Sequence, residues 1–458
     1  MGSLPGTLVR IMTSPQLLDR QRWLSGLPPT ARRRPWWQRM LHSPLFWLTV
    51  VLVPFYAYCL LNQYQMLHPD REFADGTVAL GLNNEALRQS AFWAMWTALA
   101  YVVLFVWLDR FRAQRPLVWL LTFLWGACAA TWISIHVNTW AAEAMNTTSA
   151  NADMGTRAAI FIAPFVEEAS KATVLFLLVV LFRARIVSRL SIVTLAGLSA
   201  IGFAFVENII YYARVFVYAN NTIEVTDPQA EVLSLVMLRG VYTSFGHPVF
   251  TMMTALGLAI ALGTRSKIVR VAAPLGGFVL ACGGHMLFNG VASSGDSASL
   301  RPQWFMALGL VATLILMLVF TVVAQTQLIR RRLGDYRRVG WLTDRDPVVF
   351  SSPFKRMKLQ VASLLRGPRR TWLPTTRFMR RISELAYLRE GMTRGTIGVG
   401  GDDRAREILL ELEELRPAAL TDTRGLTLFP PRRRKPLTSA PPPQSPGPAG
   451  LGGNWPAP

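Results

Sequence analysis

The sequence contains few cysteines and few acidic residues. Its 458 residues include 3 cysteines, and 27 Asp and Glu stand against 48 Lys and Arg. Cys59, Cys128 and Cys282 lie far apart, each inside an apolar segment, so they form neither a disulfide framework nor a metal-binding motif. We interpret them as small apolar packing residues. Residues 1–42 lack the apolar core and cleavage site of a signal peptide, and we expect them to form a basic cytoplasmic arm.

Hydrophobic residues make up 51% of the chain, which is typical of a polytopic membrane protein rather than a soluble one. The formal charge of +21 would by itself also suit a nucleic-acid-binding protein. However, the basic residues lie between and after the apolar segments, where they would face the cytoplasm and its anionic lipid surface. We therefore expect the lipid bilayer, and no nucleic acid, among its partners.

Several apolar segments reach about the 20 residues that a helix needs to cross a bilayer. The predicted spans are residues 43–63, 91–108, 117–135, 158–182, 192–219, 232–262, 268–292 and 304–325. Lys and Arg accumulate in every second connection, and the alternate connections contain fewer of them. The pattern predicts an all-α fold: a polytopic bundle of about eight transmembrane helices with both termini in the cytoplasm. The preference for Arg over Lys is typical of a GC-rich genome and indicates a bacterial plasma membrane.

Four regions follow from this pattern. They are the basic cytoplasmic arm (1–42), the membrane domain (43–325), a cytoplasmic helical region (326–429) and a tail (430–458). Residues 376–390 and 402–415 are predicted helices that can pair as a hairpin. The tail is rich in Pro and Gly, so we expect it to be disordered.

Few ionisable residues lie inside the apolar segments, and such residues usually face the bundle interior and serve a function. The polar residues of spans four to seven are Glu167, Glu168, Lys171, Glu207, His247, His285 and Asn289. At about 1.5 Å per helical residue, the glutamates and histidines reach similar depths, in the middle or outer half of the bilayer. Because the members of one site must share a depth, we predict that these residues form a single polar site.

Within each span the polar residues also share a helical face. Glu167 and Lys171 are four residues apart, and Tyr211 stands four residues after Glu207 on the face that also carries Phe203. Pro164 should kink the fourth span just before the glutamates, which can open a polar cavity. Arg214 and Arg239 lie nearer the outer ends of their spans, so we expect them to extend to the headgroups.

The chemistry of this set suits hydrolysis of a peptide bond inside the membrane. Two adjacent glutamates beside one lysine can divide their roles, one paired and one available as a base. Imidazoles can hold a water molecule or bind a metal, and the amide of Asn289 can donate to an oxyanion. A zinc site with His247, His285 and Glu207 as ligands stays open as an alternative. The chain has no H-E-x-x-H, no G-x-S-G and no aspartate deep in a span, which excludes the commonest zinc, serine and aspartyl peptidases.

In these residues the sequence resembles the PrsW family of intramembrane proteases, related to the CAAX prenyl-protease/ABI superfamily. The resemblance covers roughly residues 40–325 and consists of E-E-x-x-K at Glu167–Lys171, F-x-x-x-E-x-x-x-Y at Phe203–Tyr211, His247, and H-x-x-x-N at His285–Asn289. It implies a membrane peptidase whose substrate is a membrane-anchored protein. The best-known role of the family is site-1 cleavage of an anti-sigma factor.

The resemblance also implies the roles of single residues. Glu167 would be the base, Glu168 its neighbour in the motif and Glu207 a further catalytic residue, while Lys171 and Tyr211 would support the site. His247, His285 and Asn289 would orient the water and stabilise the oxyanion, or bind a metal. Asn289 stands where PrsW proteins often have Asp, and an amide is a poorer metal ligand than a carboxylate. Zinc and a metal-free mechanism therefore both remain open.

Two other functions fit the same buried carboxylates. A proton-coupled transporter would use them as a proton relay, and a non-catalytic scaffold would bind a client helix beside them. The sequence shows no inverted repeat and no matching pair of broken helices, which counts against the transporter. The oligomeric state and the substrate are not predicted by the sequence.

Overall fold

The computed structural model describes residues 35–72, 78–109, 116–144, 152–182, 188–223, 225–293, 300–365, 371–395, 397–398 and 400–421. Of the predicted basic arm, only residues 35–42 fall within these ranges. The predicted disordered tail over 430–458 lies entirely outside them.

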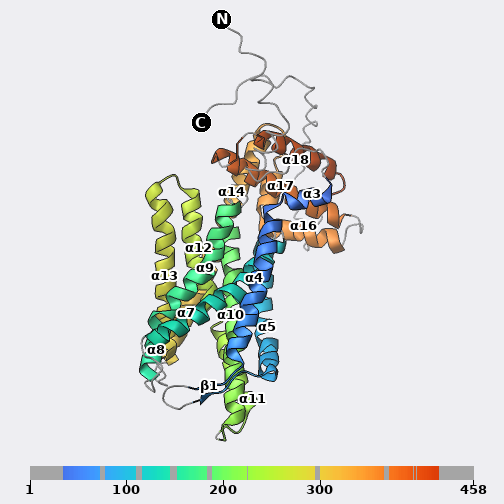
Figure 1. Ribbon diagram of the computed structural model, residues 1–458. Coiled ribbons are helices and arrows are strands. Elements are labelled where there is room, and N and C mark those ends of the chain that lie inside the picture. The colour runs from blue at the N-terminus through green and yellow to red at the C-terminus, as the bar shows by residue number, and fades with distance from the viewer. Residues whose placement is uncertain are drawn as a thin grey trace.

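Helices make up nearly all of the described structure (Figure 1). The two short strands β1 (Arg71–Glu72) and β2 (Val78–Ala79) pair antiparallel. The elements of the membrane region are α3 (Trp36–Leu41), α4 (Pro44–Leu67), α5 (Asn84–Asp109), α6 (Pro116–Leu124), the π-helical segment η1 (Trp125–Ala130), α7 (Thr131–Ala144), α8 (Ala152–Phe161), α9 (Ala163–Phe182), α10 (Arg189–Asn221), α11 (Pro228–Leu235), the π-helical segment η2 (Val236–Tyr242), α12 (Gly246–Gly263), α13 (Lys267–Ser293) and α14 (Leu300–Arg338). The C-terminal helices are α15 (Asp346–Ser351), α16 (Pro353–Leu365), α17 (Trp372–Thr393) and α18 (Gly401–Leu415).

Within the described residues, 7 helical stretches are long and apolar enough to cross a membrane. They are 44–67, 84–109, 116–141, 189–221, 228–263, 267–293 and 304–338, and they overlap seven of the predicted spans. The prediction of an all-α polytopic membrane bundle is therefore confirmed. The remaining predicted span, 158–182, consists of α8 and α9, which are separated at Ile162 just before Pro164.

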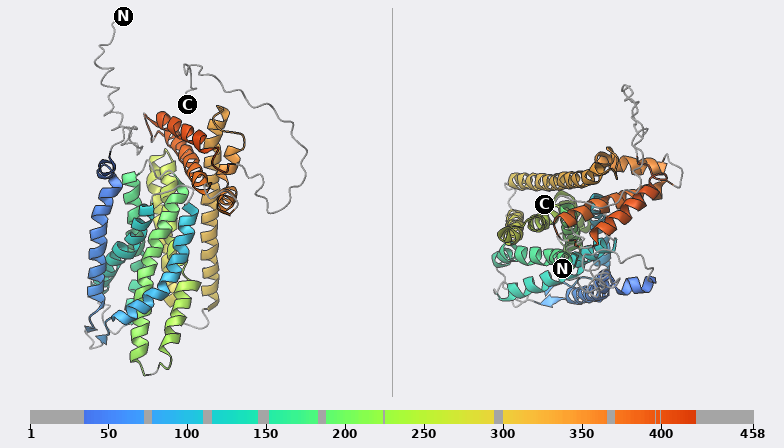
Figure 2. Two further views of the ribbon diagram at one scale, coloured as in Figure 1. Left: turned by 90° about the vertical axis from the view of Figure 1, so that its right-hand side faces the viewer. Right: turned by 90° about the horizontal axis from the view of Figure 1, so that it is seen from above.

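Helix α9 also belongs to the bundle, where it contacts α7, α10, α12 and α13. Helices α3, α16, α17 and α18 lie at the same end of the bundle in both side views (Figures 1 and 2). Because both ends of the described chain lie at the same end of the bundle, the chain must cross the bundle an even number of times between them. The 7 stretches above are an odd number, so α9 supplies a further crossing. It can carry Glu167, Glu168 and Lys171 because all three side chains are buried against protein rather than lipid.

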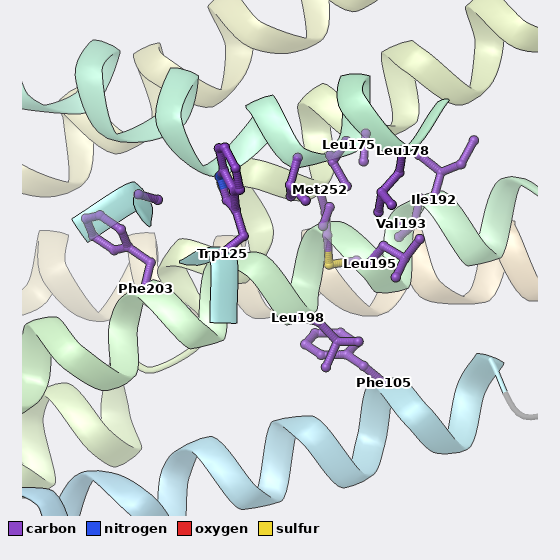
Figure 3. Close-up of a cluster of buried hydrophobic side chains, with 14 of the residues drawn as sticks. Phe105, Trp125, Leu175, Leu178, Ile192, Val193, Leu195, Leu198, Phe203 and Met252 are labelled. Atoms are coloured by element: carbon purple, nitrogen blue, oxygen red, sulfur yellow. The ribbon is translucent and has the colours of Figure 1, made fainter. Parts of the chain in front are cut away.

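Helix α10 is the centre of the bundle. Every residue from Leu190 to Ala204 is buried, and side chains from α5, η1, α9 and α12 meet this half of the helix (Figure 3). Two glycines allow the neighbouring backbone to approach α10 closely. A Cβ atom at Gly126 would lie 1.8 Å from the carbonyl oxygen of Ser199, and one at Gly202 would lie 2.1 Å from that of Phe123. Only glycine fits at these two contacts.

The predicted span over 232–262 is not one continuous helix. Helix α11 leads into η2, the chain leaves the helix at residues 243–245, and α12 begins at Gly246. Pro248 lies in the first turn of α12, where its missing N–H costs no hydrogen bond. The predicted span still coincides with the membrane-spanning stretch 228–263, but the sequence analysis did not expect the break inside it. The break at Ile162 lies where Pro164 was expected to kink the chain, and α9 and α12, which follow the two breaks, contact each other.

The C-terminal helices α15 to α18 pack with the end of α14 around a second core, in which Ile382, Leu385 and Ile408 are fully buried. The predicted helix over 376–390 lies within α17, the helix over 402–415 lies within α18, and the two helices contact each other. Arg394, just after α17, donates to the carbonyl oxygen of Leu262 near the end of α12. The C-terminal region is therefore joined to the membrane bundle.

Glu390 connects α17 with α14, and its carboxylate accepts hydrogen bonds from Arg332 and Arg394. Burial alone would raise the pKa of Glu390, but the hydrogen bond from Arg332 and the charges of Arg394 and Arg332 lower it below the usual value. A pKa that is lower in the folded state adds stability above the unfolded-state pKa, and this stability is lost as the pH falls through the folded-state pKa.

We expect Glu390→Gln to lower the unfolding temperature most at neutral pH and progressively less as the pH falls below about 4. Thermal unfolding of both proteins across this pH range measures the difference. Glu414→Gln, at an exposed position of α18, is the matched control and should show no such trend. If Glu390→Gln lowers the unfolding temperature by the same amount at every pH, the ion pairs of Glu390 do not stabilise the fold.

Candidate functional site

A cavity of about 560 Å³ lies between α7, α8, α9, α10, α12 and α13. The predicted site residues that line it are Glu167, Glu207, Tyr211, His247, His285 and Asn289. Its wall on α10 runs from Ile201 to Arg214, and its wall on α13 runs from His285 to Ser293. These parts of α10 and α13 are the ones farther from α16, α17 and α18 (Figure 1). The cavity is therefore displaced toward the opposite end of the bundle.

Glu168 and Lys171 lie behind the cavity and are fully buried. Lys171 Nζ is 2.6 Å from Glu168 Oε1. Glu168 also accepts hydrogen bonds from His285 Nδ1 at 3.1 Å and from Thr251 Oγ1 at 2.7 Å. A buried ion pair is tolerated only when both groups are bonded in this way. Glu168 is consequently occupied by the protein and does not line the cavity.

Glu167 has the opposite environment. Its side chain lines the cavity, yet Oε2 is buried and makes no hydrogen bond within the described part of the chain. The nearest nitrogen atoms at ion-pair distance from Oε2 are Lys171 Nζ at 3.6 Å and His285 Nε2 at 3.8 Å, both too far for a hydrogen bond. A buried carboxylate oxygen without a partner is unfavourable, so this atom is suited to bind a water molecule or a substrate group.

His247 is held through both of its ring nitrogens. The ammonium of Lys171 can only donate, so Nδ1 of His247 accepts its hydrogen bond at 3.0 Å. The ring proton therefore lies on Nε2, which donates to Glu207 Oε2 at 2.9 Å. Glu207 and Lys171 together fix the tautomer and the orientation of this imidazole.

Arg239 belongs to the site, and the expectation that it extends to the headgroups was wrong. Its Nη2 donates to Glu207 Oε2 at 2.6 Å, and its Nε donates to Asn208 Oδ1 at 3.0 Å. The guanidinium also lies 4.0 Å above the ring of Tyr211. Arg239 and Asn208 were missed because their distances from the span ends gave no sign of these partners. The one signal in the sequence was Gly240, next to Arg239, because a glycine allows neighbouring helices to pack closely there.

His285 is held by stacking and by one hydrogen bond. Its ring lies 5.0 Å from that of Phe250, nearly parallel at 15°, and 5.2 Å from that of His247 at 89°. Because Nδ1 donates to Glu168, the lone pair of Nε2 is left on the side of Glu167. Asn289 lies one turn further along α13, and its Nδ2 donates to the carbonyl oxygen of Ala159 at 3.0 Å.

Among the described residues, one group of three could hold a metal ion: Glu167, His247 and His285, with ligand atoms within 4.8 Å of one another. The group contains Glu167 instead of the predicted Glu207, and Oε2 of Glu207 accepts hydrogen bonds from Arg239 and His247. The donors do not fit a zinc ion, since both nitrogens of His247 already have partners. The ammonium of Lys171 beside Glu167 and His247 would also repel a dication.

Comparison with known proteins identifies a family, whose description as a metalloprotease differs from the poor fit of these donors to zinc. Residues 114–324 match a family described as PrsW family intramembrane metalloprotease. The matched segment contains all of the site residues described above. A search of curated proteins and a search of solved structures each found no match.

Proposed function

Residues 114–324 belong to the PrsW family of intramembrane proteases, and we propose that this membrane peptidase hydrolyses a membrane-anchored protein at the cavity lined by Glu167. One observation carries the proposal. Glu167 presents to the cavity a buried carboxylate oxygen that has no hydrogen-bond partner among the described residues, while both oxygens of Glu168 beside it are bonded. The structure thus supports a division of roles between the two glutamates.

Glu167 acts on a water molecule. A water bound to Glu167 Oε2 can also contact His285 Nε2, because the two atoms are 3.8 Å apart. Glu167 removes a proton from this water as the oxygen attacks the carbonyl carbon of the substrate. The same carboxylic acid then donates the proton to the leaving amide nitrogen, so Glu167 ends the cycle ionised again.

Several groups at the cavity can stabilise the negative charge that develops on the carbonyl oxygen of the substrate during the attack. The first turn of α12 lines the cavity at Gly246 and His247, and the positive end of a helix dipole stabilises an anion. Asn289 keeps a second N–H beside the one that it gives to Ala159. Glu207 and Arg239 do not take part in proton transfer. They position His247, and Lys171 holds His247 and Glu168 together.

The position of the cavity bears on the kind of substrate. It lies toward the end of the bundle opposite α3 and the C-terminal helices. The distribution of Lys and Arg predicts that this end faces away from the cytoplasm of a bacterial cell. This position suits site-1 cleavage of an anti-sigma factor, which is the role that the resemblance to the family implies.

The decisive experiment is cleavage of a defined single-span peptide by the purified protein in vesicles, with and without a zinc chelator. We expect the same rate in both, because the donor set does not fit zinc, and less than one bound metal ion per chain. Mass spectrometry of the products should place the cut in the half of the span nearer the cavity end. A rate that the chelator abolishes and added zinc restores would contradict the metal-free mechanism. An uncut peptide would contradict the proposed function.

A further inference from the structure

Helix α16 presents an apolar face that no part of the described chain covers. Phe354 is 72% exposed, Val361 48%, Leu364 65% and Leu365 73%. Their spacing of three, four and seven residues places them on one side of the helix. Large apolar side chains gathered on one surface mark a contact site, so the question is what covers them.

The opposite face of α16 fixes the orientation of the helix. Arg356 is fully buried there, and its guanidinium donates to Ser383 Oγ at 2.7 Å and to the carbonyl oxygen of Met379 at 2.9 Å on α17. Leu359, also on this face, belongs to the core of the C-terminal region. Helix α16 therefore cannot rotate to hide its apolar face without breaking these bonds.

The position of α16 indicates the bilayer. Helix α16 runs across the bundle axis on the side of α14, and α3 runs across the axis at a similar level on the opposite side, where α4 begins (Figures 1 and 2). Helix α3 likewise exposes Trp37, Met40 and Leu41. The start of a spanning helix marks the edge of the hydrocarbon layer, and Trp side chains are enriched at this edge. The apolar faces of both helices thus continue the lipid-facing surface of the bundle.

The charge on α16 agrees with a lipid surface. Lys358 is exposed within the apolar face, and Lys355 lies next to Phe354. Neither ammonium group has an ion-pair partner within the described ranges. Lysines can place their stems along apolar surface and their charges at phosphate groups.

We propose that the exposed face of α16 is seated in the boundary between headgroups and acyl chains of the surrounding bilayer, with Lys355 and Lys358 at the phosphates of anionic lipids. Helix α3 is seated at a similar level on the opposite side of the bundle (Figure 2). This attaches the C-terminal region to the membrane surface at a point separate from its contact with α12. The inference depends on the membrane bundle and not on the proposed peptidase activity.

The test uses the full-length protein in vesicles of phosphatidylcholine and phosphatidylglycerol, with a nitroxide label on Val361→Cys or Leu365→Cys. The three native cysteines are buried, and the unsubstituted protein measures their background labelling. Collisions of each label with oxygen, which concentrates in the bilayer, are compared with collisions with a water-soluble nickel chelate. We expect oxygen to dominate at both positions. A label on Glu414→Cys, at an exposed position of α18, should show the reverse.

Three results would overturn the proposal. Dominant collisions with the nickel chelate at positions 361 and 365 would place the face in water. Shielding from both reagents that disappears at one copy per vesicle would show that a second copy covers the face. The third result compares the depth of the label at Val361→Cys with and without Lys358→Glu, in vesicles that contain phosphatidylglycerol. An unchanged depth would remove the role of anionic lipid. All of these substitutions are at exposed positions, and an unchanged unfolding temperature confirms that each variant folds.

Discussion

Replacing Glu167 with Gln is expected to slow peptide cleavage by about 10²–10⁴-fold. The amide has the size of the carboxylate and still contacts water, but it cannot remove a proton from it. Because Glu167 Oε2 makes no hydrogen bond within the described structure, the substitution removes only its longer ion pair with Lys171 at 3.6 Å. We therefore expect the unfolding temperature to stay the same or to rise. The initial rate on a single-span peptide and the unfolding temperature are measured on the same preparation.

Glu231→Gln is the matched control for this experiment. Glu231 is exposed on α11 and does not line the cavity, so the same chemical change there should leave the rate unaltered. Glu167→Gln with the rate of the unsubstituted protein would remove Glu167 as the base. A slow and unstable Glu167→Gln protein would instead mean that Glu167 supports the fold, because a group used only in the reaction costs activity alone.

The membrane helices could be predicted from the sequence because the bilayer imposes a length and a polarity on each of them. Helix α10 illustrates this, since its predicted span over 192–219 lies inside the observed helix. The gathering of Glu167, Glu207, His247 and His285 around one cavity follows from the same physics. A charged residue at membrane depth has only the interior of the bundle to face.

The partners of each group within the site could not be predicted from depth. Arg239 lies in the π-helical segment η2, where the wider turn changes the direction of every following side chain relative to a regular helix. Counting residues at the regular α-helical spacing therefore places Arg239 at the headgroups rather than on Glu207. The choice of Glu207 as a metal ligand has the same origin, because nothing in the sequence shows that Arg239 binds its carboxylate.

In the C-terminal region two of the helices could be predicted from the sequence, but not what covers each helix. Helices α17 and α18 could be predicted, because a soluble amphipathic helix has its own apolar period. The exposed face of α16 has the same period, but the sequence alone does not tell whether protein or lipid covers it. That distinction needs the position of α16 relative to the bundle, and the sequence spacing does not contain this information.

Replacing Lys171 with Met is expected to lower the free energy of unfolding by about 3–5 kcal/mol, which is the usual result of removing one partner of a buried ion pair. Lys171 is fully buried, and its Nζ contacts Glu168 Oε1 at 2.6 Å and His247 Nδ1 at 3.0 Å. Methionine fills much of the same space but leaves the charge of Glu168 to His285 and Thr251 alone. Denaturant unfolding in detergent measures the loss.

The double variant Lys171→Met/Glu168→Gln tests the reason for that loss. Removing both charges leaves no unpaired ion at position 168, and Glu167 loses only its longer contact with Lys171 at 3.6 Å. The double variant should therefore be more stable than the sum of the two single losses predicts. Because Lys171 also bonds His247, the double variant should recover stability while cleavage stays slow. If the two losses simply add, the pairing of Lys171 with Glu168 does not stabilise α9. Slow cleavage would then have to come from a distorted bundle rather than from a misplaced His247.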